Sequence, residues 1–505
     1  MELVYLWVEK YKNIVEEGFN FSPKFECKYD KDSNELTIDE NEDYISIFPD
    51  NINVTAIVGE NGSGKSAIIE NIFEFLDGTP LDKRSIIIYK EEDNYICITD
   101  IEDINTSSID NIKVIKRNEH GISSKLLVYN HIYEHSNRNF RGYTTIEVDK
   151  KGVVNVLVFH YAQSIDFHLS DFMYQPNKIK IKYKDNDSLV ELFKRMSSST
   201  EELLELYNEK EPFHQFLIIL CARKGIDDIE FYHNKEDMIE RIGLSRGELT
   251  TLYTEFTTLT TGREFDFTEE NKINIKKYTS REYFDLFDFD LIDVKNRRYN
   301  DLSHGEQVLF GLLLNIFFYS KNESKIFLLD EPELSLHPQW QKGLLNQIIK
   351  LLEQFTDNKY QLIVTSHSPF LLSDLPKENA IFLVKGKQKY PFAESQTFGA
   401  NIHTLLSGGF FMNNGLMGEF AKEKIEEIKK FYELVKILKN KQFIRLKKLY
   451  LKRKKKFRHI KSIIGEPFLQ TIIKNYLDEL EVIFNGKKQF LQSEIKRLQE
   501  LESTL

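Results

Sequence analysis

The residues of this chain with the clearest chemistry form a short glycine-rich run that follows an apolar stretch. The run consists of Gly59, Glu60, Asn61, Gly62, Ser63, Gly64, Lys65 and Ser66. This spacing is that of a phosphate-binding loop, whose glycines let backbone N–H groups turn toward phosphate. Lys65 would reach the β- and γ-phosphates, and Ser66 would supply a hydroxyl ligand to Mg²⁺. The run predicts binding of ATP and Mg²⁺, but by itself it also allows a kinase, a GTPase or a helicase.

Two acidic residues follow a second apolar run. Asp330 and Glu331 come directly after a predicted buried strand, where Asp330 would bind Mg²⁺ and Glu331 would orient and deprotonate the attacking water. His367 ends a further apolar run and could hydrogen-bond the γ-phosphate or the water. A lone histidine in such a place is more often a satisfied core residue, so both interpretations of His367 stay open.

A sequence signal for the N-terminus of a helix stands directly before the longest apolar helical segment of the chain. Ser303 and Glu306 have the spacing of a capping box and stand before the apolar run 308–319. One interpretation is an ordinary capped core helix. In the other, the cap and the helix dipole point at a γ-phosphate.

The predicted elements that must position these residues indicate an α/β protein with four parts. Residues 2–58 show the alternation of strands, and short strands recur up to Val153–Tyr161. Helical periodicity dominates the next stretch, and apolar runs then alternate with helical segments, as in an α/β sheet. We expect 1–169 to hold a β-subdomain and the phosphate loop, 170–298 an inserted helical lobe, 299–395 the second half of the nucleotide-binding domain, and 396–505 a C-terminal helical region.

The composition fits a soluble globular protein. The chain has 505 residues, a net charge of −11 and only three isolated cysteines, which favours a reducing cytoplasmic location and gives no zinc site. The N-terminus carries acidic residues early and no long apolar region, which argues against a signal peptide. No apolar run approaches membrane-spanning length, so we expect no membrane partner.

In this order, the motifs resemble those of the ATP-binding-cassette (ABC) ATPases. The resemblance implies an ABC-type ATPase head with a signature at Leu302–Gln307, a Walker B pair at Asp330 and Glu331, and a switch histidine at His367. The run from Ser303 to Glu306 and the run from Glu331 to Pro338 depart from the transporter pattern toward the SMC-type, DNA-repair and phage-defence branch.

In that branch two chains close head to tail. The resemblance therefore implies a homodimer in which Ser303 and Gly305 of one chain contact the ATP held by Lys65 of the other. It also requires a Q-loop glutamine, for which Gln163, just after the predicted strand Val153–Tyr161, is the candidate.

The C-terminal stretch resembles the AAA-family ATPases of bacterial anti-phage systems, most closely the PtuA ATPases of Septu and retron systems. The ATPase of the PARIS system belongs to the same branch. Such ATPases work with a separately encoded effector, for example an HNH nuclease or a toxin. The chain lacks a TOPRIM pattern, an HNH-type Cys/His cluster and a zinc-hook motif. We therefore expect it to hydrolyse ATP and to cut nothing itself.

A basic segment stands out on this acidic chain. Lys439–Lys461 contains many Lys and Arg residues and no acid. It could bind DNA or RNA through phosphates, dock an acidic partner, or form a solvated helix face.

Three functions follow from these patterns. The first is an ATP-driven switch in an anti-phage complex, in which dimer or oligomer assembly controls the effector. The alternative is a DNA-repair or chromosome-maintenance ATPase that acts directly on DNA. The engine of a membrane transporter is disfavoured, because the signature and the residues after Glu331 depart from the transporter pattern.

Overall fold

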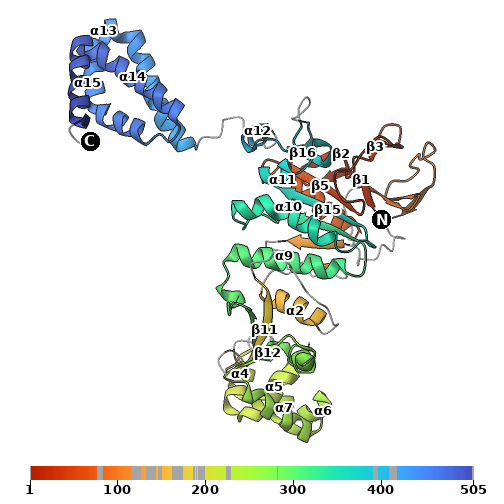
Figure 1. Cartoon of the computed structure of the whole chain (residues 1–505). Coiled ribbons are helices and arrows are strands. Elements are labelled where there is room, and N and C mark those ends of the chain that lie inside the picture. The colour runs from red at the N-terminus through yellow and green to blue at the C-terminus, as the bar shows by residue number, and fades with distance from the viewer. Residues whose placement is uncertain are drawn as a thin grey trace. The chain divides into compact units, whose positions relative to one another are not determined.

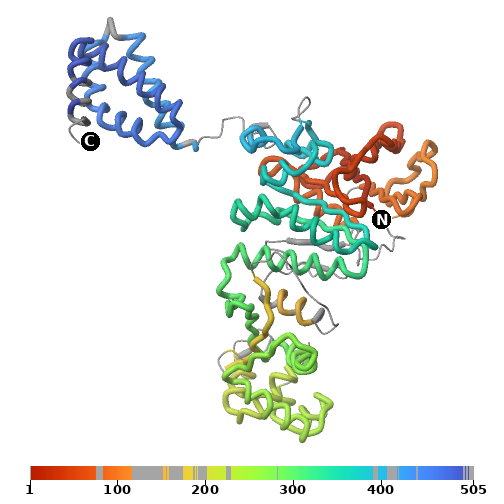
Figure 2. The backbone as a smooth tube through the Cα atoms, viewed as in Figure 1, coloured from red at the N-terminus to blue at the C-terminus, as the bar shows by residue number. Residues whose placement is uncertain are grey.

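The computed structural model describes residues 2–76, 84–116, 127–131, 144–145, 150–161, 174–185, 188, 190, 200–222, 229–280, 283–390, 396–408 and 418–502. The chain forms two compact units, Met1–Phe411 and Met412–Leu505. Figures 1 and 2 trace the backbone of each unit.

The first unit is built around a seven-stranded sheet with the order β10-β9-β14-β15-β5-β16-β17. Its strands are β5 (Ile52–Gly59), β9 (Leu127–His131), β10 (Thr144–Thr145), β14 (Lys325–Asp330), β15 (Tyr360–Ser366), β16 (Ala380–Val384) and β17 (Lys387–Gln388). All neighbours pair in parallel except β16 and β17. Thr365 of β15 is in register with both Asp330 of β14 and Ile57 of β5, so these strands end at one common edge.

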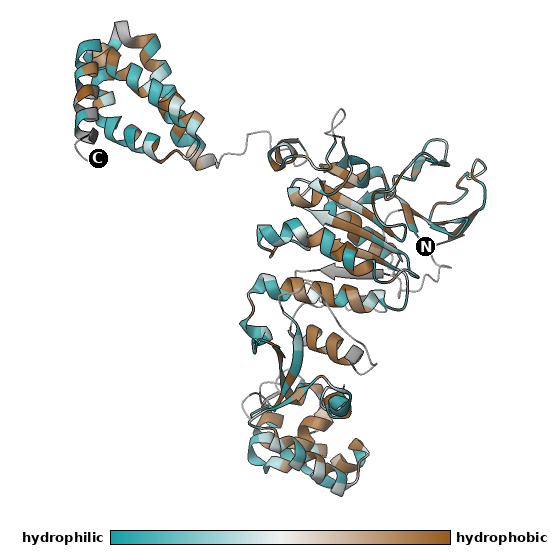
Figure 3. Cartoon of the chain, viewed as in Figure 1, coloured by the Kyte–Doolittle hydropathy of each residue, from teal (hydrophilic) through white to brown (hydrophobic). Residues whose placement is uncertain are grey.

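The alternation of side chains along each strand separates two apolar cores. Ile57, Leu328 and Ile363 pack on one face with α1 (Lys65–Leu76), whereas Ala56, Leu329 and Val364 share the other core. The second core includes α9 (His304–Ser320) and α10 (Pro338–Leu352). Because α9 is buried over most of its surface, it is apolar all round, and Figure 3 shows it mostly in the brown of hydrophobic residues.

An antiparallel β-subdomain joins the α1 side of the sheet. It has the order β2-β1-β6-β7-β8, with only β7 and β8 parallel, and a separate hairpin of β3 and β4. The bounds are β1 (Glu2–Tyr11), β2 (Ile14–Asn20), β3 (Phe25–Asp30), β4 (Glu35–Glu40), β6 (Ser85–Glu91), β7 (Asn94–Thr99) and β8 (Ile112–Lys116). Residues of β1, including Leu3 and Leu6, belong to the same core as α1, so the subdomain packs on the side of the sheet that this helix covers.

The inserted lobe combines helices with a small sheet. Helix α2 (Lys150–Tyr161) precedes the lobe, whose described helices include α4 (Thr200–Glu209), α5 (Pro212–Ala222), α6 (Lys235–Ile242), α7 (Arg246–Thr258) and α8 (Lys272–Tyr278). Three antiparallel strands, β12 (Arg263–Asp266), β11 (Pro176–Tyr183) and β13 (Phe287–Asp293), form the sheet in that order. In Figure 1 this lobe lies beyond α9, on the side away from the seven-stranded sheet.

Short elements complete the first unit. They are the 3₁₀ turns η3 (Glu230–His233), η4 (Glu269–Asn271), η5 (Phe284–Leu286), η6 (Tyr299–Asp301) and η7 (Lys377–Asn379), with the helices α11 (Pro369–Ser373) and α12 (Ile402–Gly408).

The predicted α/β class, with its β-subdomain, inserted lobe and helical C-terminal region, is confirmed, but two local predictions need correction. The predicted strand Val153–Tyr161 lies in helix α2. Its buried residues Val153, Val154, Leu157 and Val158 have helical spacing, and a short apolar run does not distinguish a buried helix from a strand. The lobe was predicted to be helical, but it also contains the strands β11 and β13. Apolar residues alternate along both strands in the sequence, but the helical periodicity of the surrounding segments favoured helices in the prediction.

The second unit is helical. It consists of α13 (Glu419–Ile463), α14 (Pro467–Asn485) and α15 (Lys487–Glu502). Gln442 has non-helical dihedral angles (φ −136°, ψ 31°) and divides α13 into two halves. Both halves pack with α14 around a core of their own. Within the described part of the chain, no helix is both long and apolar enough to span a membrane.

Candidate functional site

The predicted phosphate loop joins β5 to α1 at the common edge of the sheet. Gly62 and Gly64 have φ angles of +73° and +112°, which side-chain-bearing residues rarely adopt. A Cβ atom on Gly59 would come within 2.4 Å of the carbonyl oxygen of Leu383. The helix begins at Lys65, so its N-terminal N–H groups lie next to the loop, as anion binding requires.

Two neighbouring turns hold this loop in place. The Asn13 side chain, between β1 and β2, donates a hydrogen bond to the Gly62 carbonyl (2.8 Å). The Gly386 N–H, between β16 and β17, donates one to the Ser63 carbonyl (2.8 Å). Gly386 has φ +81°, and a Cβ atom there would lie 2.0 Å from the Asn13 carbonyl oxygen. Neither Asn13 nor Gly386 belongs to a local motif, so no short sequence pattern predicts their role.

Lys65 is 5% exposed and lies at the centre of the candidate site. Its Nζ atom is within 3.3 Å of the Gly59 and Glu60 carbonyls, 2.7 Å from Nε2 of His367 and 3.7 Å from Oε1 of Glu331. Burial lowers the pKa of Lys65, and the nearby Glu331 and Asp330 carboxylates oppose that shift. The structure thus brings together residues from the predicted loop and from two other strands.

Nε2 of His367 also lies 3.0 Å from Oε1 of Glu331. Unprotonated, this nitrogen accepts a hydrogen bond from Lys65, whereas in its protonated form it donates one to Glu331. The hydrogen bond from His367 is the largest cause of the lowered pKa of Glu331, and Lys65 adds to it. Glu331 has a φ of +48°, a strained value for a glutamate, and its N–H donates to the Thr365 hydroxyl (2.9 Å).

The predicted Mg²⁺ ligands are adjacent. The Ser66 hydroxyl donates to Oδ1 of Asp330 at 3.0 Å, and the Thr365 hydroxyl donates to the same oxygen. A hydroxyl and a carboxylate are hard oxygen ligands of the kind that Mg²⁺ prefers. Among the described residues, no group of three or more His, Cys, Asp or Glu side chains could hold a metal alone. Ser66 and Asp330 thus fit Mg²⁺, an ion that commonly keeps several waters and binds substrate phosphates beside one or two protein ligands.

A buried carboxylate connects the acidic turn to the histidine. Glu333 is 3% exposed, and its Oε1 atom accepts hydrogen bonds from the Ser366 hydroxyl and from the His367 N–H (2.9 Å). Burial raises the pKa of Glu333. The Gln341 side chain donates to the Glu333 and Leu336 carbonyls and accepts from the Ser368 hydroxyl, which ties the same two segments together.

The signature residues stand apart from the phosphate loop. Ser303 is exposed, caps α9 and exchanges hydrogen bonds with Glu306, which confirms the predicted capping box. A Cβ atom on Gly305 would lie 2.7 Å from the carbonyl oxygen of Ser335, so α9 contacts the turn that follows Glu331. Among the described residues, no hydrogen bond joins Ser303 or Gly305 to Lys65 or Ser66. Gln163 lies outside the described residues, and the segment before it is helix α2 rather than a strand.

Comparisons with known proteins agree with an ATPase core. Residues 54–373 match the protein family described as "AAA domain, putative AbiEii toxin, Type IV TA system". The chain is 25% identical over 435 residues to the "Retron Vc95 probable ATPase" of Vibrio cholerae serotype O1 biovar El Tor, with 76% of this chain and 79% of that protein covered. It is 32% identical over 99 residues to the "Retron Ec83 probable ATPase" of Escherichia coli, with 18% and 17% covered.

Solved structures with some likeness include heads of SMC proteins and ABC cassettes. An SmcHead bound to the C-winged helix domain of ScpA has a TM-score of 0.28 and 13% identity, with 77% of this chain and 96% of that chain covered. A nucleotide-free ATP-binding cassette from an ABC transporter has a TM-score of 0.27 and 12% identity, with 77% and 90% covered. Likeness at this level carries no functional conclusion.

Proposed function

This chain belongs to the AAA-domain family matched above and is an ATPase, and we propose that two copies of it hydrolyse ATP with Mg²⁺ at shared sites to control a separately encoded effector. The observation that carries the catalytic part is the meeting of Lys65, Ser66, Asp330, Glu331 and His367 at one edge of the parallel sheet.

Each side chain has a role in this proposal. The loop N–H groups and Lys65 hold the β- and γ-phosphates, and the start of α1 adds its dipole. Ser66 and Asp330 would bind Mg²⁺, which supplies charge neutralisation at the phosphates. The lowered pKa of Glu331 keeps its carboxylate charged, so that it can orient the attacking water and accept its proton. His367 hydrogen-bonds Glu331 or the γ-phosphate.

The dimer and the effector form the second part of the proposal. Ser303 is exposed at the N-terminus of α9, and Gly305 is buried two residues further on, so in a dimer Ser303 of one chain can face the phosphates held by Lys65 of the other. The names of the two relatives place those proteins in retrons. We extend this to an anti-phage role in a Septu- or retron-type complex, with the halves 1–169 and 299–395 as the ATPase head and 396–505 as the partner region.

Steady-state hydrolysis and nucleotide binding of two variants test the catalytic part. Lys65→Ala should abolish both ATP binding and hydrolysis. Glu331→Gln should bind ATP within about threefold of the wild type and lose about a hundredfold or more in kcat, as general-base removal does. Full hydrolysis by both variants would contradict the proposed site. Full protection against phage infection by both variants would contradict the proposal that ATP binding and hydrolysis drive defence, and would leave the ATPase assignment standing.

A further inference from the structure

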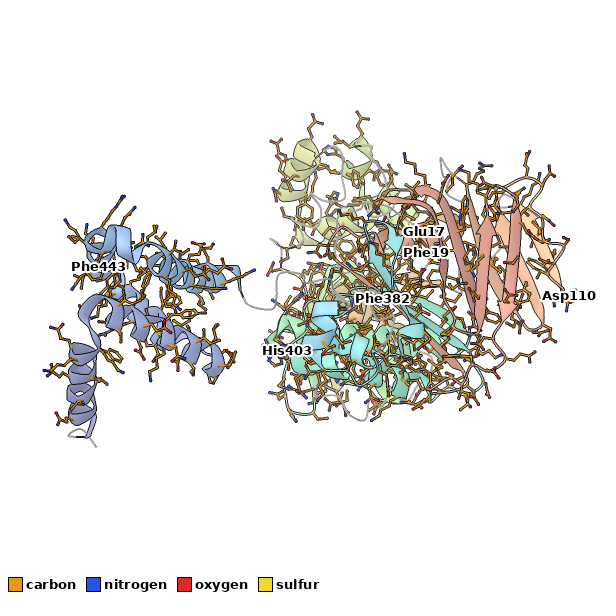
Figure 4. The ribbon with its side chains drawn as sticks, turned by 90° about the horizontal axis from the view of Figure 1, so that it is seen from above. Glu17, Phe19, Asp110, Phe382, His403 and Phe443 are labelled. Carbon is orange, nitrogen blue, oxygen red and sulfur yellow. The ribbon has the colours of Figure 1, made fainter. Side chains whose placement is uncertain are left out.

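The second half of α13 carries many basic residues, and two sets of four among them differ in their contacts. This half follows the break at Gln442 and contains no acidic residue. It begins at Phe443, whose ring lies 5.6 Å from that of Phe484 and which is labelled in Figure 4. The core-facing residues Leu446, Tyr450 and Phe457 are buried, so the opposite side of this half-helix faces solvent.

The first set is paired with acidic residues of the same unit. Lys454 and Arg458 contact Oε1 of Glu481 at 2.7 and 3.1 Å, and Glu481 also accepts a hydrogen bond from Tyr450. Arg453 and Lys456 contact Glu427 of the first half of α13 at 3.7 and 2.9 Å. These pairs connect the second half of α13 to α14 and to the first half, so they serve the fold of the unit.

The second set consists of Arg445, Lys448, Lys452 and Lys455, here named the basic stripe. All four residues are exposed, and none of the described residues forms an ion pair with them. At about 100° of rotation per residue they lie within roughly 80° of the helix circumference, opposite the buried face. With a rise of about 1.5 Å per residue they follow one another over roughly 15 Å.

A row of cations with this spacing suits a linear polyanion. Phosphates follow one another along a nucleic-acid strand at about 3.4 Å of helix rise, so four cations over this length can contact about four of them. We propose that the basic stripe binds the sugar–phosphate backbone of a nucleic acid. This goes beyond the proposed ATPase function, because it adds a ligand class and places it on the second unit.

An acidic amphipathic helix of another protein is the competing ligand. It would need apolar contacts, and Ile444 and Leu451 are 85% and 55% exposed beside the stripe. They stand at its edge rather than between its cations, which leaves an uninterrupted row of charge. That row favours phosphates over an amphipathic protein surface.

Binding by the full-length chain, measured without nucleotide by fluorescence anisotropy, tests the proposal. The probes are a labelled single-stranded DNA of about 20 nucleotides, RNA of the same sequence and the matching duplex. Lys452→Gln with Lys455→Gln should raise Kd about tenfold and reduce the slope of log K against log salt by about two. Arg453→Gln with Lys456→Gln removes the same charge from neighbouring positions and should change Kd less than about twofold.

Three outcomes would overturn the proposal. The first is no binding of any of the three probes. The second is an equal loss of nucleic-acid affinity in both double variants, which would indicate that net charge alone determines binding. The third is tighter binding of labelled poly-glutamate that Ile444→Ser with Leu451→Ser weakens, which would assign the surface to an acidic protein. ATP hydrolysis of the same variants should equal that of the wild type, and Lys65→Ala should retain nucleic-acid binding, so the two proposals fail separately.

Discussion

At the scale of single residues, Glu333 holds the backbone of His367 from a different segment of the chain. Its buried carboxyl accepts the His367 N–H and the Ser366 hydroxyl, while its own backbone carbonyl is held by Gln341. The side chain therefore spans from the turn after Glu331 to the end of β15. Since no hydrogen bond joins it to Lys65 or Ser66 among the described residues, and its charge is the smallest of the named influences on the pKa of Lys65, we expect its main effect on hydrolysis to pass through His367 or the turn.

Removal of this acceptor should lower turnover without weakening ATP binding. We expect Glu333→Ala to reduce kcat about tenfold or more, and Glu333→Gln, which keeps an acceptor oxygen and the side-chain volume, to stay within about threefold. The measurement is a double-mutant cycle with His367→Ala for kcat. A double variant no slower than His367→Ala alone indicates action through the histidine. Additive losses would indicate an effect independent of His367, and a matching fall in thermal stability would indicate a purely structural role.

Gly386 supports the phosphate loop from outside the motif. A Cβ atom there would overlap the Asn13 carbonyl, and Asn13 in turn holds the Gly62 carbonyl. We expect Gly386→Ala to displace the loop and raise the Kd for ATP about tenfold or more. Gly243→Ala is the matched control, because Gly243 has nearly the same φ (+82°) and a Cβ atom there would have no other atom within 4 Å. Isothermal titration should then show equal ATP affinity for the control and the wild type. An equal loss of ATP affinity in both variants would contradict a specific role of Gly386 in holding the phosphate loop.

At the scale of elements, a buried acid joins α13 to α14 in the second unit. Glu481 is 5% exposed and contacts Lys454, Arg458, Tyr450 and Asn485. Burial alone would raise the pKa of Glu481, but Lys454, Tyr450 and Arg458 together bring it below its ordinary value. A carboxyl whose pKa is lowered by folding stabilises the fold above its unfolded pKa of about 4.3 and loses that contribution as the pH falls through the folded pKa.

Replacement of this acid should loosen the second unit and change its response to pH. We expect Glu481→Gln to destabilise the pairing of α13 and α14 by about 1–3 kcal/mol at neutral pH, since buried donors lose a charged acceptor. Hydrogen exchange of α13 and α14 amides in the full-length chain measures this. In the wild type, protection of these amides should persist from pH 7 to about pH 5 and decrease below about pH 4. In the variant, protection should decrease less between about pH 5 and about pH 4, because the titrating carboxyl is absent. Identical exchange in the two proteins would exclude Glu481 as a stabilising contact.

The elements also show what the sequence could and could not predict. The phosphate loop, the capping box at Ser303 and the strand that ends at Asp330 were predictable, because each depends on residues within a few positions of one another. The assembly of Lys65, Asp330 and His367 was also predictable, since parallel strands of one sheet end at a common edge.

Contacts between distant segments were beyond the sequence alone. Asn13 and Gly386 each act through one hydrogen bond, and the Glu333 carboxyl through two, to residues that no short pattern relates to them. The basic segment shows the same limit, because its composition is plain but its division into paired and unpaired cations depends on where Glu427 and Glu481 fall in space. The small sheet of β11 and β13 was missed for another reason: period-two alternation was present but short, and longer helical patterns surrounded it.

At the scale of the whole molecule, the site should need two chains. In the proposed dimer, the exposed Ser303 of one copy of α9 acts on the ATP that the other chain holds. Lys65→Ala removes the loop function of one chain, and Ser303→Arg removes the contribution to the other chain's site. Each variant alone should be inactive.

In an equal mixture, half of the dimers are mixed and each has one intact pair of Lys65 and Ser303, so about a quarter of the wild-type hydrolysis rate should return. A mixture of Lys65→Ala with Glu331→Gln serves as the control, because both changes affect the same half-site and no intact site can form. Recovery in that control, or none in the first mixture while both variants dimerise, would contradict a shared site.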